Sequence, residues 1–151
     1  MRFPLFIDLD GKRAVVAGAG PVGRRRALIL LEYGARVILA APDACAADFA
    51  GIDALTVLAR PVERADLEGA HIAVAATDDR QTNHAMALWC RSAGIPVSVA
   101  DCPEECDFFF PAVAHAGKLS AGICSDGTDH TLVSEAAADI RTLLEENYGD
   151  R

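Results

Sequence analysis

The fold of this chain is decided by residues 14–23, which read Ala14-Val-Val-Ala-Gly18-Ala-Gly20-Pro-Val-Gly23. A short apolar run leads into three glycines with the spacing Gly-x-Gly-x-x-Gly. Between a strand and a helix, the first glycine permits the tight turn, the second lets a pyrophosphate approach the backbone, and the third lets the helix pack closely on the strand. The motif predicts a dinucleotide site with Gly18, Gly20 and Gly23 as binding residues. A merely structural glycine turn is the alternative.

The residues that follow complete a strand–helix–strand unit. A helical pattern over residues 24–33 ends at Gly34, and a second apolar run follows over residues 37–41. The unit is about thirty residues long, and in that context the glycine motif is a strong signal for a dinucleotide. The start of the helix would present free N–H groups and the positive end of its dipole to an anion.

The acidic residue that usually holds the ribose is absent from the end of the second strand. NAD sites normally carry Asp or Glu there, whereas this chain has Ala41, followed by Pro42 and Asp43. We expect Asp43, or the backbone of Pro42 and Asp43, to contact the ribose from the loop. No arginine follows the strand to bind a 2′-phosphate, which favours NAD over NADP.

Apolar strands and helices continue to alternate up to residue 100. The expected elements are strands at 55–60, 71–77 and 95–100, a helix at 80–93, and a helical alanine-rich stretch between Pro42 and Ala50. Short connections between such elements predict an α/β fold, a Rossmann-like parallel sheet with helices on both faces.

After Asp101 the pattern changes to a small β-hairpin, residues 108–124, and a last helix, residues 130–147. We therefore predict two domains. Residues 1–103 form an NAD-binding Rossmann domain, and residues 104–151 form a hairpin and helix for dimerisation or substrate binding.

Composition narrows the function further. The net charge of −8 argues against binding nucleic acid, which needs a clustered basic face. No apolar run reaches the length of a membrane span, and the N-terminus is too short and acidic for a signal peptide.

The five cysteines are odd in number and scattered, so we expect reduced thiols and a cytoplasmic location. A zinc site can be drawn from Cys102, Cys106, His115 and Cys124, but it lacks the paired spacing of structural zinc, and no metal is expected.

Polar residues follow two of the expected strands, at the sheet edge where ligands bind in parallel folds. Asp101 directly ends a strand, so its carboxylate could move a proton near a bound nicotinamide; a helix cap or a solvated loop acid is the alternative. Thr77 and Asp78 line the cofactor or cap the next helix. We expect Asn83 and His84 on the exposed face of that helix.

Taken in order, these segments resemble the precorrin-2 dehydrogenase / sirohydrochlorin ferrochelatase family, the N-terminal module of siroheme synthase. The stretches that carry the resemblance are Phe3–Phe6, residues 16–26, Gly34–Val37, Ala41-Pro42, Ala75–Asp79, Asn83, Val99–Asp101, Phe109–Pro111 and Ser125–Thr128. The resemblance implies NAD-dependent oxidation of precorrin-2, a tetrapyrrole, to sirohydrochlorin. Some members also insert Fe²⁺ to make siroheme. It further implies a homodimer formed through the region after the parallel sheet.

The resemblance also implies roles for single residues. Asp101 matches the family aspartate implicated in catalysis. Pro21-Val22 and Pro42-Asp43 match its NAD contacts, and Ser125 matches a serine at the tetrapyrrole site. From the same loop, Gly127 and Thr128 are further candidate substrate contacts. The loop itself is either an anion-binding helix start or only a cap.

Two departures from the family pattern qualify the predicted activity. Family members often read Thr-Ser-Pro where this chain has Thr128-Asp129-His130. Longer members continue past the position of Arg151 into a helical extension that helps build the cleft, so we expect weak or absent iron insertion. One alternative is a bifunctional enzyme that also inserts Fe²⁺ into sirohydrochlorin. The others are a non-catalytic NAD or tetrapyrrole sensor or carrier, and a dehydrogenase of another small substrate.

Overall fold

The computed structural model describes residues 2–44, 46–127 and 129–149, and the chain divides into two compact units. The larger unit runs from Ile7 to Phe108. The smaller unit combines the N-terminal residues up to Phe6 with the chain from Phe109 onwards.

The larger unit is built on a five-stranded, all-parallel sheet with the order β3-β2-β1-β4-β5. The strands are β1 (Arg13–Ala17), β2 (Arg36–Ala40), β3 (Leu55–Leu58), β4 (Ile72–Ala75) and β5 (Val97–Val99). The chain first moves outward from β1 to β3 and then returns to the other side of β1 to form β4. The strand order therefore reverses between β1 and β4, and such a reversal opens a crevice at the carboxyl ends of the strands.

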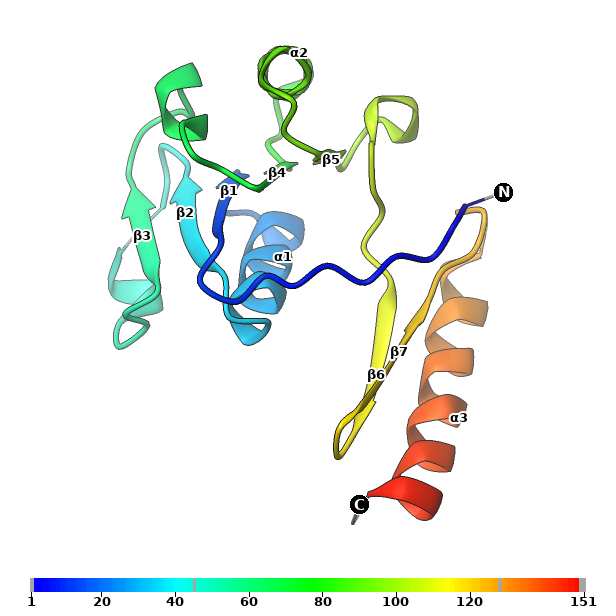
Figure 1. The fold of residues 1–151 in the computed structure, drawn as a ribbon. Coiled ribbons are helices and arrows are strands. Elements are labelled where there is room, and N and C mark those ends of the chain that lie inside the picture. Colours follow the sequence, from blue (N-terminus) through cyan, green and yellow to red (C-terminus); the bar gives the residue numbers. More distant parts are fainter. Residues whose placement is uncertain (1, 45, 128, 150–151) are drawn as a thin grey trace. The chain divides into compact units, whose positions relative to one another are not determined.

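Helices cover both faces of this sheet. Helix α1 (Pro21–Glu32) lies on one face and α2 (Arg80–Ala93) on the other (Figure 1). Three short 3-10 helices connect the strands: η1 (Ala46–Phe49), η2 (Arg64–Leu67) and η3 (Pro103–Glu105). The predicted Rossmann-like α/β fold is confirmed.

The alanine-rich stretch differs from its prediction in extent. Among its described residues, the stretch contains only the single 3-10 turn η1 before Gly51, which adopts a left-handed conformation with φ of +84°. Phe49 is the one buried residue of that turn. Between Pro42 and Gly51, the buried apolar side chains of the described residues are the small Ala44 and Phe49. This is too little buried surface to stabilise a longer helix.

The core lies on both sides of the central strands. Every residue of β4 is buried, as are residues 14–17 of β1, which explains why both strands read as continuous apolar runs. On the α2 face they pack against Met86, Ala87 and Cys90. Burial raises the pKa of the Cys90 thiol to about 12, so this side chain stays neutral and packs as a small apolar group.

The smaller unit is an antiparallel hairpin with one helix packed on it. Strands β6 (Ala112–Ala116) and β7 (Leu119–Ile123) pair, and α3 (His130–Tyr148) contacts both. Arg141 of α3 donates to the carbonyl of Val113 at 3.0 Å. The guanidinium of Arg2 lies 3.5 Å from the centre of the Phe109 ring, which ties the N-terminal residues to this unit. The predicted hairpin and last helix are confirmed.

In the part of the chain that the structure describes, no helix has the length and apolar character needed to cross a membrane.

Candidate functional site

The turn between β1 and α1 leaves no room for side chains at two of its glycines. Gly18 has a φ of +100°, and a Cβ there would collide with the carbonyl oxygen of Ala76. A Cβ on Gly23 would collide with the carbonyl oxygen of Gly18. These two positions are therefore glycine for reasons of conformation and close approach, and together they bring the start of α1 against the ends of β1 and β4.

Gly20 has a different reason to be glycine. Its φ of −66° suits any residue, and a Cβ built there would meet nothing within 4 Å. The space in front of Gly20 is therefore open, as the approach of a pyrophosphate requires. Gly20 is also the N-cap of α1, followed by the exposed Pro21 and Val22, and no side chain caps this helix start. The first-turn N–H groups thus remain available to an anion.

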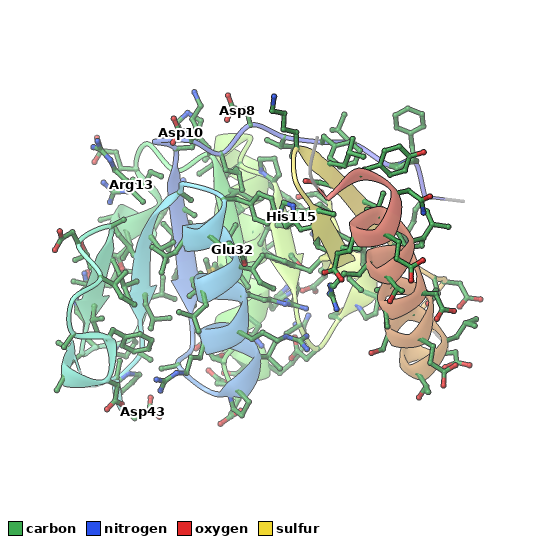
Figure 2. The ribbon with its side chains drawn as sticks, turned by 90° about the horizontal axis from the view of Figure 1, so that it is seen from below. Asp8, Asp10, Arg13, Glu32, Asp43 and His115 are labelled. Carbon is green, nitrogen blue, oxygen red and sulfur yellow. The ribbon has the colours of Figure 1, made fainter. Side chains whose placement is uncertain are left out.

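The loop after β2 lies at the same edge of the sheet. Figure 2 shows Asp43 at the opposite end of the sheet from Asp10 and Arg13, the side where the strands end. Pro42 and Asp43 are both exposed there. A shallow hollow of about 670 Å³, lined in part by Arg13 and His71, lies at the other, amino-terminal edge and is separate from the glycine turn.

Asn83 holds the loop that follows β4. Its side chain is fully buried, and its Oδ1 accepts from the N–H of Thr77 at 3.0 Å and from the Thr77 hydroxyl at 2.7 Å. Its Nδ2 donates to the carbonyl of Thr77 at 3.0 Å. Placing Asn83 on the exposed face of α2 was therefore wrong. The helical spacing of Asn83 was the sequence signal for its burial, because Asn83 falls on the same helical face as the buried Met86, Ala87 and Cys90.

The cap of α2 is Asp79 and not Asp78. The Asp79 carboxylate accepts from the N–H groups of Gln81 and Thr82, both at 3.1 Å. The Thr82 hydroxyl and these N–H groups lower the pKa of Asp79. Asp78 is exposed and stands one residue too early for an N-cap, because the helix begins at Arg80.

Asp101 stands in the turn after β5, at the same sheet edge as the glycine turn. The N–H of the preceding Ala100 still donates to the carbonyl of Ala75 in β4, at 2.8 Å. The Asp101 side chain is 36% exposed, and its Oδ1 accepts from Nη1 of Arg80 at 3.2 Å. It caps no helix: the neighbouring η3 has Cys102 as its N-cap residue, without a side-chain hydrogen bond.

Asp101 belongs to a charged cluster that the sequence analysis did not predict. Its other members are Arg80, His84 and Glu105. The second guanidinium nitrogen of Arg80 contacts Oε1 of Glu105, and that oxygen lies 2.6 Å from Nδ1 of His84. Arg80 and His84 are four residues apart on α2, so they share a face of the helix. That spacing was visible in the sequence, whereas the approach of Glu105 depends on the course of η3.

Cysteines near this cluster have structural roles. The sulfur of Cys106 accepts from the N–H of Val99 at 3.1 Å, which ties the η3 loop to β5. Burial and a hydrogen bond with Glu104 raise the pKa of the Cys102 thiol, which disfavours the nucleophilic thiolate form. Among the described residues, no group of three or more His, Cys, Asp or Glu side chains is arranged to hold a metal ion.

The loop before α3 is a local turn followed by a cap. The hydroxyl of Ser125 accepts from the N–H of Gly127 at 3.1 Å, and Asp129 caps α3 by accepting from the N–H of Leu132 at 2.9 Å. Thr128, a candidate substrate contact, lies outside the described residues. The substrate role of Ser125 and Gly127 stays a prediction.

Residues 5–112 match the model of a protein family described as "Putative NAD(P)-binding". The chain belongs to this NAD(P)-binding family. The cofactor class predicted from the glycine motif, a nicotinamide dinucleotide, is therefore confirmed.

This NAD(P)-binding chain is similar in sequence to longer proteins. It is 39% identical over 145 residues to a "Probable multifunctional siroheme biosynthesis protein HemA" of Ruminiclostridium josui, covering 94% of this chain and 28% of that protein. It is 33% identical over 148 residues to a siroheme synthase of Methylococcus capsulatus, covering 97% and 31%. The chain thus spans about a third of the length of these curated relatives.

A solved structure of SirC, a precorrin-2 dehydrogenase, matches with a TM-score of 0.75 and 25% identity, over 98% of this chain and 74% of that one. Together with the siroheme synthase relatives, this match confirms the resemblance to the precorrin-2 dehydrogenase module. The roles of individual site residues stay predictions.

We expect Asn83→Ala to lower the free energy of unfolding by about 2–3 kcal/mol, because it leaves the N–H and carbonyl of Thr77 without partners in a part-buried loop. Urea unfolding followed by circular dichroism measures the difference. The matched control is Gln81→Ala, an exposed position on the same helix, which should change stability by less than about 0.5 kcal/mol. Equal losses in the two variants would contradict the role given to Asn83.

Proposed function

We propose that this chain oxidises precorrin-2 to sirohydrochlorin with NAD as the oxidant. The observation that carries the proposal is the position of Asp101, a carboxylate that follows β5 at the same sheet edge as the glycine turn. The fold around it matches a precorrin-2 dehydrogenase over 98% of the chain. The siroheme synthase relatives support the same substrate class, a tetrapyrrole of siroheme biosynthesis.

The residues at the glycine turn fit the dinucleotide. Gly20 offers open space, and α1 begins with uncapped N–H groups that would hold the pyrophosphate. Pro21 and Val22 would border it, and Pro42 and Asp43 would face the adenosine ribose from the loop after β2. Thr77, held by Asn83, and Asp78 would line the cofactor beside β4.

The reaction removes a hydride and a proton from precorrin-2. When bound at the glycine turn, NAD⁺ would supply the acceptor for the hydride. The carboxylate of Asp101 takes the proton and later releases it to solvent, so that the products are sirohydrochlorin, NADH and H⁺. The task of the chain is to place this carboxylate near the reacting atoms.

For the cofactor, we expect Gly20→Asp to abolish detectable NAD binding in calorimetry while the protein stays folded. The new side chain has room and can cap α1, so stability should be kept. Its charge would occupy the approach of the pyrophosphate and repel it.

Gly20→Asn is the matched control for that variant, because it adds the same bulk without charge. It should retain more NAD affinity than Gly20→Asp. Unchanged NAD affinity in a folded Gly20→Asp protein would remove the site assignment.

For catalysis, we expect Asp101→Ala to lower dehydrogenase turnover by about 10²–10⁴-fold, the usual contribution of a general base. NAD affinity should change little, because the glycine turn binds the dinucleotide. The assay follows NADH and the sirohydrochlorin spectrum from precorrin-2 and NAD. Full turnover in Asp101→Ala would refute the proton-transfer role, and tight NAD binding without turnover in the wild type would point to a non-catalytic carrier.

We also propose that the smaller unit pairs with a second copy of the chain. Large apolar side chains are exposed on its hairpin and helix, among them Leu119, Leu132 and Leu143. Leu143→Arg should then shift the sedimentation coefficient from that of a dimer to that of a monomer, and a wild-type protein that sediments as a monomer would contradict the proposal. The cytoplasmic location expected from the cysteines stays a prediction.

A further inference from the structure

We propose that Arg80 is a positioning residue, which Glu105 and His84 hold in place so that it orients the carboxylate of Asp101 for proton transfer. This inference rests on the proposed function, in which Asp101 accepts the substrate proton. It assigns the charged cluster at the end of β5 to the site and not to the stability of the fold.

The first step of the argument is the contact between Arg80 and Asp101. One guanidinium nitrogen, Nη1, donates to Oδ1 of Asp101 at 3.2 Å. Among the described residues, no hydrogen bond or ion pair is recorded for Oδ2. The arginine therefore fixes one oxygen of the carboxylate and leaves the other available for a substrate proton. The planar guanidinium suits this task because its nitrogens can hold two carboxylates at fixed angles.

The second step is the anchor of Arg80 itself. Its Nη2 contacts Oε1 of Glu105, whose side chain is only 14% exposed, and His84 lies against the same oxygen. The hydrogen bond from Arg80, together with that from His84, holds the pKa of Glu105 below its ordinary value. Glu105 is thus a carboxylate at neutral pH, and it holds the guanidinium through Nη2, whereas Asp101 contacts Nη1.

The third step is the attachment of Glu105 to the sheet. The residues that follow it bind the edge strand β5: the Cys106 sulfur accepts from the N–H of Val99 at 3.1 Å. Asp107 binds Val97 twice. A carboxylate oxygen of Asp107 accepts from the N–H of Val97 at 3.0 Å, and the backbone N–H of Asp107 donates to the carbonyl of Val97 at 2.8 Å. The cluster is therefore attached to β5, the strand that Asp101 follows.

The contact between Arg80 and Asp101 contributes little to the stability of the fold. The side chains of Arg80 and Asp101 are 44% and 36% exposed, and ion pairs that exposed contribute little to folding. A lone aspartate on an exposed turn would instead sample several rotamers. Because misplacing a reacting group by about 1 Å can cost about 10²-fold in rate, holding this carboxylate matters for turnover.

The kinetic test compares variants of Arg80 in the full chain. We expect Arg80→Ala to lower kcat by roughly 10–100-fold, with the KM for NAD unchanged, and Arg80→Lys to restore part of the loss. In the Asp101→Ala background, Arg80→Ala should cost nothing further, because its effect acts through that carboxylate.

Arg91→Ala is the matched control for Arg80→Ala. Arg91 is an exposed arginine of the same helix that contacts the backbone carbonyl of Glu105 but makes no contact with Asp101. It should leave kcat unchanged. Additive losses in the double variant, or a raised KM for precorrin-2 that persists without Asp101, would show that Arg80 acts on the substrate directly and would overturn the inference.

A second measurement does not depend on activity. Three-bond couplings to the Asp101 side-chain carboxyl carbon, measured by NMR, report its χ1 rotamer. We expect one rotamer in the wild type and averaged rotamers in Arg80→Ala. An averaged wild-type rotamer refutes positioning whatever the enzyme does. A fixed wild-type rotamer that Arg80→Ala releases, in a protein that makes no NADH from precorrin-2, upholds the positioning contact and refutes only the proposed function.

Discussion

The close approach of three backbone segments at Gly18, Gly23 and Ala76 is the constraint on which the rest of this structure depends. Two of the three positions cannot carry a Cβ, because it would collide with a carbonyl oxygen. Their contact sets α1 against the ends of β1 and β4, the two strands between which the strand order reverses. The geometry of the sheet edge at that reversal is therefore set by backbone packing, and the polar loops after β4 and β5 lie at the same edge.

Those polar loops are held by side chains that come from α2. Asn83 forms hydrogen bonds with the N–H and carbonyl of Thr77, and Arg80 reaches the turn after β5. A single helix thus connects two of the strand ends that border the crevice. This arrangement explains why α2 is polar over its first turn and apolar further along, where it faces the sheet.

The sequence alone predicted what depends on local pattern. The glycine spacing and the apolar runs sufficed for the sheet, its two helices and the hairpin with α3, since each depends on residues near one another in the chain. The errors concern the contacts of single side chains and not the elements that carry them. Asn83 was placed outside because its type is usually exposed, although its spacing with Met86 and Cys90 indicated the buried face. The contact of Glu105 with Arg80 could not be read from sequence, because it depends on how η3 turns back along β5.

The bare start of α1 also has a thermodynamic consequence. A helix with glycine at its N-cap is less stable than one capped by Ser, Thr, Asp or Asn by only about a few tenths of a kcal/mol, and here Gly20 contributes no capping oxygen. An anion that binds the first N–H groups of α1 supplies the missing acceptor and belongs to the folded state alone. Occupancy and folding are then linked: a ligand present at one hundred times its dissociation constant adds about 2.7 kcal/mol to the free energy of unfolding. The same glycine that opens the site makes the empty fold less stable than the loaded one.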